Sequence, residues 1–251
     1  MSHEPGDLAA SKALTGQRVL ITGGAKRIGR AIALELAAAG ARVAITYRGS
    51  KFEADQTVAD LERETPGALA LQCDVTDEAS VNAAVAEAVQ RMHGLDILIN
   101  NAGAFETAPL EKITAEQWDA MFATNTRGPF LVAKAAHGAL AAGSGRIVNI
   151  GSLGGLHPWP THAHYCTSKA ALHMLSQTMA KAWAPEISVN CVAPGMIAIG
   201  ATDAAYEHLA AKTPMKRNGT PADVAAAVLF FATAPHFITG QLLAVDGGLA
   251  L

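Results

Sequence analysis

The chain has 251 residues, of which 50% are hydrophobic and 16% are charged, and its formal net charge at pH 7 is -3. A chain of this length and apolar content can bury one substantial core and lies within the range of a single domain. The weakly negative charge offers no binding surface for a polyanion, which argues against nucleic acid as a partner.

The N-terminal region, residues 1–15, lacks the apolar core of a signal peptide, and no apolar run in the chain is long enough for a membrane span. We therefore expect a flexible tail over residues 1–15, a folded domain over residues 16–251, a cytoplasmic location and no membrane partner. Because Cys73, Cys166 and Cys191 are odd in number and scattered, we expect reduced thiols, no disulfide and no cysteine-based metal site.

Short apolar runs alternate with longer alanine-rich runs along the chain, which is the pattern of repeated strand–helix units. The helix after the first strand shows the expected period, because Ile28, Ile32 and Leu36 are each four residues apart. The short runs are almost uninterrupted, as in parallel strands covered on both faces. We predict an α/β single-domain Rossmann fold, with a doubly wound, parallel seven-stranded sheet flanked by helices and a ligand beyond the carboxyl ends of the strands. The predicted strands are residues 18–22, 42–46, 68–73, 96–100, 146–150, 187–193 and 241–245.

A glycine-rich turn, TGGAKRIG at residues 22–29, follows the first predicted strand and opens a helix. In that context, backbone amides and the helix N-terminus bind the pyrophosphate of a dinucleotide. The turn alone is weak evidence, because any tight strand-to-helix connection also needs glycine for backbone reasons. Arg27 stands where a middle glycine is expected, which raises the question of what a bulky cation adds there.

The end of the second predicted strand favours NADP(H) over NAD(H). A dinucleotide-binding fold distinguishes the two cofactors there, with a carboxylate for the ribose hydroxyl or an arginine for the 2'-phosphate. The segment TYRGSKFEA has Arg48 and Ser50 at this point and no acidic residue before Glu53. A guanidinium matches phosphate oxygens with several donors, so we predict NADP(H). The alternative is that Arg48 is a solvated loop cation.

A tyrosine and a lysine four residues apart occur in YCTSK, at Tyr165 and Lys169, just before an apolar helical run. Residues at this spacing share one face of a helix. An unperturbed tyrosine, with a pKa near ~10, exchanges protons poorly at neutral pH, but a neighbouring ammonium stabilises its phenolate. Tyr165 is therefore a candidate general acid. Alone, the spacing is common by chance and would usually be a surface pair.

Together these motifs resemble the short-chain dehydrogenase/reductase family. NNAG at residues 100–103, Asn125 in ATNTRGPF and Ser152 in IGSLGG accompany the turn and YCTSK in the family's order, from about residue 18 to the end. The resemblance implies that Ser152 holds the substrate oxygen and that Tyr165 supplies its proton. It implies that Lys169 binds the nicotinamide ribose and tunes Tyr165, and that Asn125 supports a water-linked proton path.

The same resemblance implies an NADP(H) site across the carboxyl ends of the strands. Asp74 would contact the adenine, Asn101 would help to frame the cofactor, and the segment after Pro194 would cover the nicotinamide. The chain departs from the family's pattern at Ile199, in the loop 196–215, where a threonine that contacts the cofactor is common. The expected cofactor-binding residues are Gly23, Lys26, Arg27, Ile28, Gly29, Tyr47, Arg48, Ser50, Asp74, Val75, Asn101, Ala102, Gly103, Tyr165, Lys169, Pro194, Gly195 and Ile197.

The pattern T-G-x-x-x-R-x-G is similar to that of the pteridine reductase branch, in which the arginine reaches both cofactor and substrate. NNAGAF places Phe105 where that branch stacks an aromatic ring on the pterin, and HPWP, APEISVN and FITGQLLAVDGG are also similar to its bacterial members. That branch commonly has aspartate where this chain has Ser152, and a hydroxyl suits a carbonyl substrate better. Phe105 is alternatively an ordinary loop aromatic. The candidate substrate residues are Arg27, Phe105, Ser152 and Trp159.

Three histidines, His157, His162 and His164, cluster before Tyr165. No carboxylate or cysteine accompanies them at a spacing typical of a metal site, so we expect histidines at a pocket rim or facing solvent and no metal.

Three functions stay open at this point. The first is NADPH-dependent hydride transfer to the carbonyl of a small molecule, the second is pteridine reduction, and the third is an NADP-binding sensor or scaffold without turnover. A binder needs no proton donor, which argues against the third. Reduction of substrates on an acyl carrier protein is a further carbonyl option, although Gly143 and Glu186 offer no basic docking patch. The resemblance implies a homotetramer with interfaces in residues 114–136, residues 163–182 and the C-terminal segment.

Overall fold

The computed structural model describes residues 12–199 and 210–251. Among these residues, seven strands form a single sheet in the order β3-β2-β1-β4-β5-β6-β7, and every neighbouring pair is parallel. This sheet confirms the predicted doubly wound fold, and each strand overlaps its predicted segment. The strands are β1 (Arg18–Ile21), β2 (Arg42–Tyr47), β3 (Leu69–Gln72), β4 (Ile97–Asn100), β5 (Gly145–Ile150), β6 (Ile187–Pro194) and β7 (Leu242–Val245).

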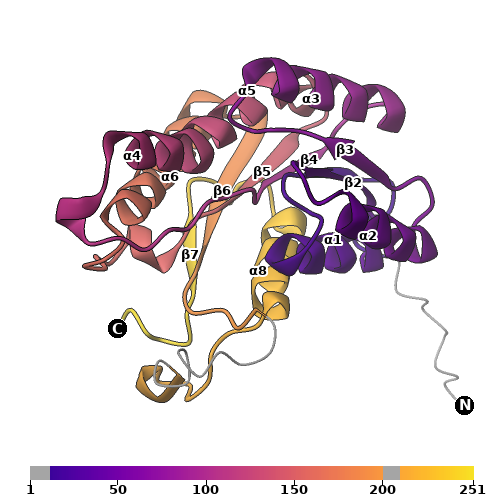
Figure 1. Cartoon of the computed structure of the whole chain (residues 1–251). Coiled ribbons are helices and arrows are strands. Elements are labelled where there is room, and N and C mark those ends of the chain that lie inside the picture. The colour runs from indigo at the N-terminus through magenta and orange to yellow at the C-terminus, as the bar shows by residue number, and fades with distance from the viewer. Residues whose placement is uncertain (1–11, 200–209) are drawn as a thin grey trace, which may run out of the picture.

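Helices cover both faces of the sheet, and each set shares a hydrophobic core with the strands (Figure 1). The helices on one face are α1 (Arg27–Ala38), α2 (Lys51–Glu64) and α8 (Pro221–Thr233). Those on the other face are α3 (Glu78–Met92), α4 (Ala115–Phe122), α5 (Gly128–Ala141) and α6 (Ala163–Ala182). A π-helical turn at Ala123–Arg127 joins α4 to α5, and a short 3-10 turn at Leu153–Gly155 follows β5.

Burial on both faces explains why the strand segments read as uninterrupted apolar runs. In β1, Val19 and Ile21 pack with α1 and α8, whereas Leu20 between them packs with α3 and α5. All three side chains are fully buried. The edge strand β7 differs, because Leu243 is 39% exposed and Ala244 is also exposed. These exposed side chains show that the expectation that every strand is covered on both faces is wrong for β7.

The order of the strands creates the crevice in which a ligand is expected. β1 lies beside β4, although β2 and β3 come between them in the chain. Successive connections therefore leave β1 and β4 in opposite directions, which opens a crevice at their carboxyl ends. The glycine-rich turn follows β1, residues 101–103 follow β4 and Ser152 follows β5. Three segments that are far apart in the sequence thus border one crevice.

Of the predicted N-terminal tail, residues 1–11 lie outside the described residues. Leu14, by contrast, is 2% exposed and belongs to the core beside α1. Its backbone amide donates to the carbonyl of Ala39 at 2.8 Å, so the folded part extends ahead of the predicted boundary at residue 16. No helix within residues 12–199 and 210–251 is long and apolar enough to cross a membrane.

Candidate active site

The glycine-rich turn is tied to the segment after β4. The Asn101 side-chain amide donates to the carbonyl oxygens of Thr22 and Gly23, at 3.0 Å each, and its backbone amide donates to Thr22 Oγ1 at 3.0 Å. A Cβ on Gly29 would collide with the Gly23 carbonyl and the Asn101 amide, so only glycine fits at the start of α1. The structure thus brings together Gly23, Gly29 and Asn101, and it adds Thr22, which the sequence reasoning did not include.

Arg27 adopts a left-handed backbone conformation, with φ 55. This region favours glycine, and a bulky residue there costs about 1–3 kcal/mol unless its surroundings hold it. The side chain is exposed, and its guanidinium makes no ion pair with any residue that the structure describes. Its neighbour Lys26 lies 4.0 Å from Glu53. The turn therefore keeps one unpaired cation at the mouth of the crevice, at a cost in backbone strain.

The end of β2 presents a second unpaired cation. Arg48 is exposed, and within the described part of the chain its guanidinium has no carboxylate partner at salt-bridge distance. Ser50 is the N-cap of α2, yet its hydroxyl makes no capping hydrogen bond. The Asp74 carboxylate accepts from Thr76 N at 2.9 Å and from Thr76 Oγ1 at 2.7 Å, which holds the pKa of Asp74 below its usual value. The positive charge of Arg48 lowers the pKa of Asp74 further, so the two side chains lie near each other at this edge of the sheet.

Asn125 lies in the π-helical turn and is fully buried. Its Oδ1 accepts from Ala104 N at 2.8 Å, and its Nδ2 donates to Ala104 O and to Ser168 Oγ at 3.0 Å each. The side chain therefore connects the segment after β4 to α6. A Cβ on Gly103 would lie 3.3 Å from Asn125 Oδ1 and 3.6 Å from Lys169 Nζ, so these three residues adjoin one another.

Ser152, Tyr165 and Lys169 meet at the carboxyl end of β5. Ser152 is 3% exposed and its hydroxyl accepts from Gly154 N at 3.0 Å. The same hydroxyl is near enough to Tyr165, on the first turn of α6, to lower the pKa of its phenol. One helical turn later, Lys169 is buried and its ammonium donates to the Ile150 carbonyl at 2.8 Å. The i, i+4 spacing thus points both side chains of α6 at the end of β5.

Burial dominates the ionisation of this cluster. It raises the pKa of Tyr165 above its ordinary value, and the hydrogen bond with Ser152 only partly opposes this. Burial also lowers the pKa of Lys169 to about 8. The expected lowering of the Tyr165 pKa by Lys169 is therefore not found in this structure, in which desolvation of the phenolate is the largest effect on this pKa. Tyr165 is protonated at neutral pH, as proton donation requires.

Aromatic rings line the approach to Tyr165. The Phe105 ring meets Tyr165 edge to face with centroids 4.8 Å apart, and the Trp159 ring lies parallel to Tyr165 at 6.0 Å. His162 stacks on Phe105 at 4.9 Å. Phe105 is 57% exposed, so one face of this aromatic wall is open to a ligand. The candidate substrate residues Phe105, Ser152 and Trp159 therefore all adjoin Tyr165.

The three histidines before Tyr165 differ in environment. His157 is exposed, and His162 is half-buried with hydrogen bonds to Thr107 at 2.9 Å and Thr161 at 3.0 Å. His164 is fully buried, so the expectation of a rim or solvent position is wrong for it. It packs inward from α6, with Nε2 3.7 Å from a Glu106 carboxylate oxygen. No three His, Cys, Asp or Glu side chains gather as a metal site within residues 12–199 and 210–251.

The segment after β6 borders the crevice from the other side. Gly195 N donates to the Val245 carbonyl at 3.0 Å, and Ile197 forms an isolated bridge with Gly219. Ile199 is 46% exposed. The predicted cover over the nicotinamide involves the loop 196–215, of which residues 200–209 lie outside the described residues.

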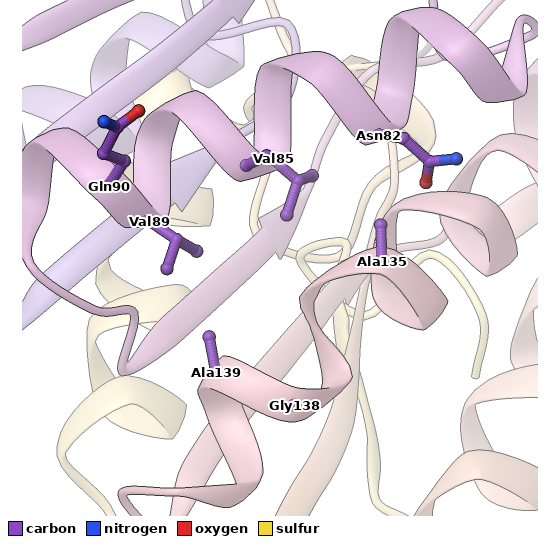
Figure 2. A pocket seen from close by; sticks show the side chains of 8 residues that line it. Asn82, Val85, Val89, Gln90, Ala135, Gly138 and Ala139 are labelled. Carbon is purple, nitrogen blue, oxygen red and sulfur yellow. The ribbon is translucent and has the colours of Figure 1, made fainter.

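The surface also carries two hollows away from this cluster. One, of about 410 Å³, lies between α3 and α5, where Val85 and Val89 face Ala135 and Ala139 (Figure 2). The other, of about 490 Å³, lies beside β7 and includes Met215. Neither is lined by Ser152, Tyr165 or Lys169, so the chemistry-bearing side chains belong to the crevice and not to these hollows.

The parallel, doubly wound sheet defines a Rossmann-type protein. A serine, a tyrosine and a lysine form a polar site beyond the carboxyl ends of its strands. A family model described as "Enoyl-(Acyl carrier protein) reductase" matches residues 11–250. A 3-oxoacyl-[acyl-carrier-protein] reductase of Synechocystis is 37% identical over 95% of this chain and 99% of its own length. The chain belongs to the short-chain dehydrogenase/reductase family.

Solved structures agree closely with this fold. A dehydrogenase/reductase from Sinorhizobium meliloti 1021 superposes with a TM-score of 0.92 at 36% identity, covering 97% of this chain and 99% of that one. A short chain dehydrogenase from Burkholderia cenocepacia J2315, solved in complex with NADP, gives a TM-score of 0.89 at 37% identity over 95% of this chain and all of that one.

Proposed function

We propose that this protein uses NADPH to reduce the carbonyl group of a small molecule. The observation that carries the proposal is the cluster formed by the buried Ser152 and Lys169 with the half-buried Tyr165, at the same edge of the sheet as the glycine-rich turn. A protonated tyrosine can donate a proton to a carbonyl oxygen, and a nearby serine hydroxyl and ammonium can stabilise the charge that develops on that oxygen.

The residues present fit NADP(H). Gly23 and Gly29 let the turn pack closely against Asn101 and Ala102, at the N-terminus of α1 where a pyrophosphate would lie. Arg48 and Ser50 supply an unpaired guanidinium and a free hydroxyl at the end of β2, where a 2'-phosphate would lie. Lys169 and Asn101 would hold the nicotinamide end. The Burkholderia relative, solved with NADP, supports the same cofactor for this chain.

When bound, NADPH supplies the hydride. Tyr165 donates a proton to the substrate oxygen that gains negative charge, and its raised pKa keeps that proton in place until then. Ser152 accepts from Gly154 N, which orients its hydroxyl and leaves the O–H as a donor towards the substrate oxygen or Tyr165. The Lys169 ammonium, fixed by the Ile150 carbonyl, stabilises the developing charge in a buried setting.

Replacing Arg48 by alanine is expected to raise the KM for NADPH by about 10- to 100-fold, because one charge-assisted contact worth about 1.5–3 kcal/mol is lost. The KM for NADH should change little, since NADH has no 2'-phosphate. Initial rates with both cofactors measure the effect. Arg63→Ala is the matched control, because Arg63 is an exposed cation on α2 that pairs with Asp60. Equal use of NADH and NADPH by the parent would exclude the assignment.

The substrate is tested by NADPH oxidation with four compounds: a small ketone, a 3-oxoacyl thioester, the same acyl group on an acyl carrier protein, and a dihydropterin. We expect turnover of the small ketone or thioester. The acyl-carrier substrate is the second candidate, because the Synechocystis relative is named for it. Exposed Gly143 and Glu186 provide no basic surface for such a carrier, which favours the free compound. A parent that binds NADPH and turns over none of the four would instead support a sensor or scaffold.

Arg27 separates a ketone pocket from a pteridine pocket. Arg27→Gly is expected to fold with a Tm near that of the parent, because glycine adopts the observed φ of 55 without strain. If the arginine contacts substrate, the KM for dihydropterin rises and that for a small apolar ketone stays constant. The open aromatic wall at Phe105 is what favours testing the pterin. A change confined to the KM for NADPH would assign the arginine to the cofactor alone.

We also propose a homotetramer. Large apolar side chains are exposed on the predicted interface segments: Phe130 on α5 is 41% exposed, Met174 on α6 is 63% exposed, and the C-terminal Leu251 is fully exposed. Such side chains support contact between copies of the chain. Light scattering of the purified protein gives the assembly size, and a monomer mass would contradict the proposal.

A further inference from the structure

We propose that His173 is a positioning residue that fixes the backbone of Ser152 for the proposed reduction, by accepting a hydrogen bond from the Ser152 amide. His173 lies on α6 one turn after Lys169 and is 7% exposed. Its Nε2 accepts from Ser152 N at 3.3 Å. The inference rests on the proposed function, because Ser152 has a catalytic role only there.

Side chains from two consecutive turns of α6 form hydrogen bonds with the backbone at the end of β5. Lys169 Nζ holds the Ile150 carbonyl at 2.8 Å, and His173 Nε2 holds the Ser152 amide two residues further on. The Ser152 hydroxyl in turn accepts from Gly154 N, which starts the 3-10 turn. A backbone held at two points, with the hydroxyl held at a third, leaves the serine little freedom to move away from Tyr165.

The glycines around Ser152 are fitted to the histidine ring. A Cβ on Gly151 would collide with His173 Nε2, and a Cβ on Gly155 would lie 2.6 Å from His173 Cε1. Neither glycine has a positive φ, so the backbone conformation does not require glycine at either position. The imidazole takes up the space that a side chain would need at both positions, together with Cys191 Sγ beside Gly151 and the α6 backbone beside Gly155. Gly151, Gly155 and His173 therefore form one matched set around Ser152.

The ring must be neutral to accept this bond, because a protonated imidazole has only donors. Burial and the Lys169 ammonium lower the pKa of His173 to about 4. The Gly155 carbonyl favours the protonated ring, but this effect is smaller. Cys191, on β6, also lies beside Gly151, because a Cβ there would come within 2.9 Å of its Sγ, and the raised pKa of Cys191 keeps it a neutral thiol. At neutral pH the ring is thus neutral, and acceptance at Nε2 requires the ring proton on Nδ1, which has no hydrogen-bond partner among the described residues.

The test compares His173→Leu, which removes the acceptor, with His173→Gln, whose side-chain oxygen reaches about as far as Nε2. His173→Leu is expected to lower kcat by about 10- to 100-fold through misplacement of Ser152, with the KM for NADPH unchanged. His173→Gln is expected to recover most of that loss. His137→Leu is the matched control, because His137 lies on α5 against Trp183, away from the site.

A double-mutant cycle distinguishes positioning from general loss of structure. If His173 acts through Ser152, then His173→Leu costs little further activity once Ser152 is alanine. Full activity of His173→Leu, equal loss in the leucine and glutamine variants, or additive losses with Ser152→Ala would each overturn the inference.

A readout without turnover keeps this test separate from the proposed function. Deuterium uptake of peptides spanning residues 150–155 is expected to rise in His173→Leu and to stay low in His173→Gln and His137→Leu. If the parent shows no NADPH-dependent turnover, the proposed function fails, whereas unchanged deuterium uptake in His173→Leu shows that the histidine does not hold this segment.

Discussion

Tyr165→Phe is expected to lower kcat by about 10²- to 10⁴-fold, the usual contribution of a positioned general acid. The substitution keeps the ring, and with it the contacts to Phe105 and Trp159. Only the hydroxyl is lost, together with the influence of Ser152 on it. The affinity for NADPH should therefore stay near that of the parent, so that the loss lies in the chemical step.

Single-turnover measurement of NADPH oxidation, combined with a direct binding titration, separates the two effects. Thr233→Val serves as the comparison, since it removes an exposed hydroxyl from the end of α8, on the opposite face of the sheet from α6. It should leave kcat near the parent value. Substantial reductase activity in Tyr165→Phe would show that the proton comes from another group.

The fold was predictable because burial on both faces leaves a simple mark on the sequence. Val19, Leu20 and Ile21 alternate between the two cores, so a strand of this kind is apolar at every position. Ile32 and Leu36 are fully buried on α1, as their spacing indicates. The same reasoning failed at Leu243, because the composition of a strand does not reveal that part of its face is left uncovered.

The candidate site was predictable where its geometry is local. Tyr165 and Lys169 share a helix face by spacing alone, and the ends of parallel strands bring Ser152 to the same edge of the sheet. The bond between His173 and Ser152 joins residues 21 apart and depends on how α6 packs against the end of β5. Its only trace in the sequence is a histidine four residues after the lysine.

The pKa shifts of the cluster could not be predicted from the sequence either. Neighbouring charge alone predicts a lowered pKa for Tyr165, but burial raises it. Desolvation depends on the whole packed environment, which spacing along a helix does not describe. The left-handed backbone of Arg27 is a similar case, because the turn motif identifies the residue and not its conformation.

Lys169→Met is expected to lower kcat by about 10²-fold or more, because a charge that stabilises the developing oxyanion is removed from a buried site. Methionine nearly conserves the length of the side chain, but it leaves the Ile150 carbonyl without its donor. Lys134→Met is the matched control, because Lys134 is an exposed cation on α5 that pairs with Glu78. The control should change neither kcat nor KM.

The pH profile gives this prediction its sharpest form. Burial lowers the pKa of the Lys169 ammonium from its ordinary value of 10.5 to about 8. Below about pH 8 the ammonium is present, and as the pH rises through this value it is lost, so kcat for reduction should fall on the alkaline side. Lys169→Met has no such group, and its low activity should be flat through the same range. A parent-like fall near pH 8 in Lys169→Met would assign that titration to a different group, and an undiminished kcat would remove Lys169 from the reaction.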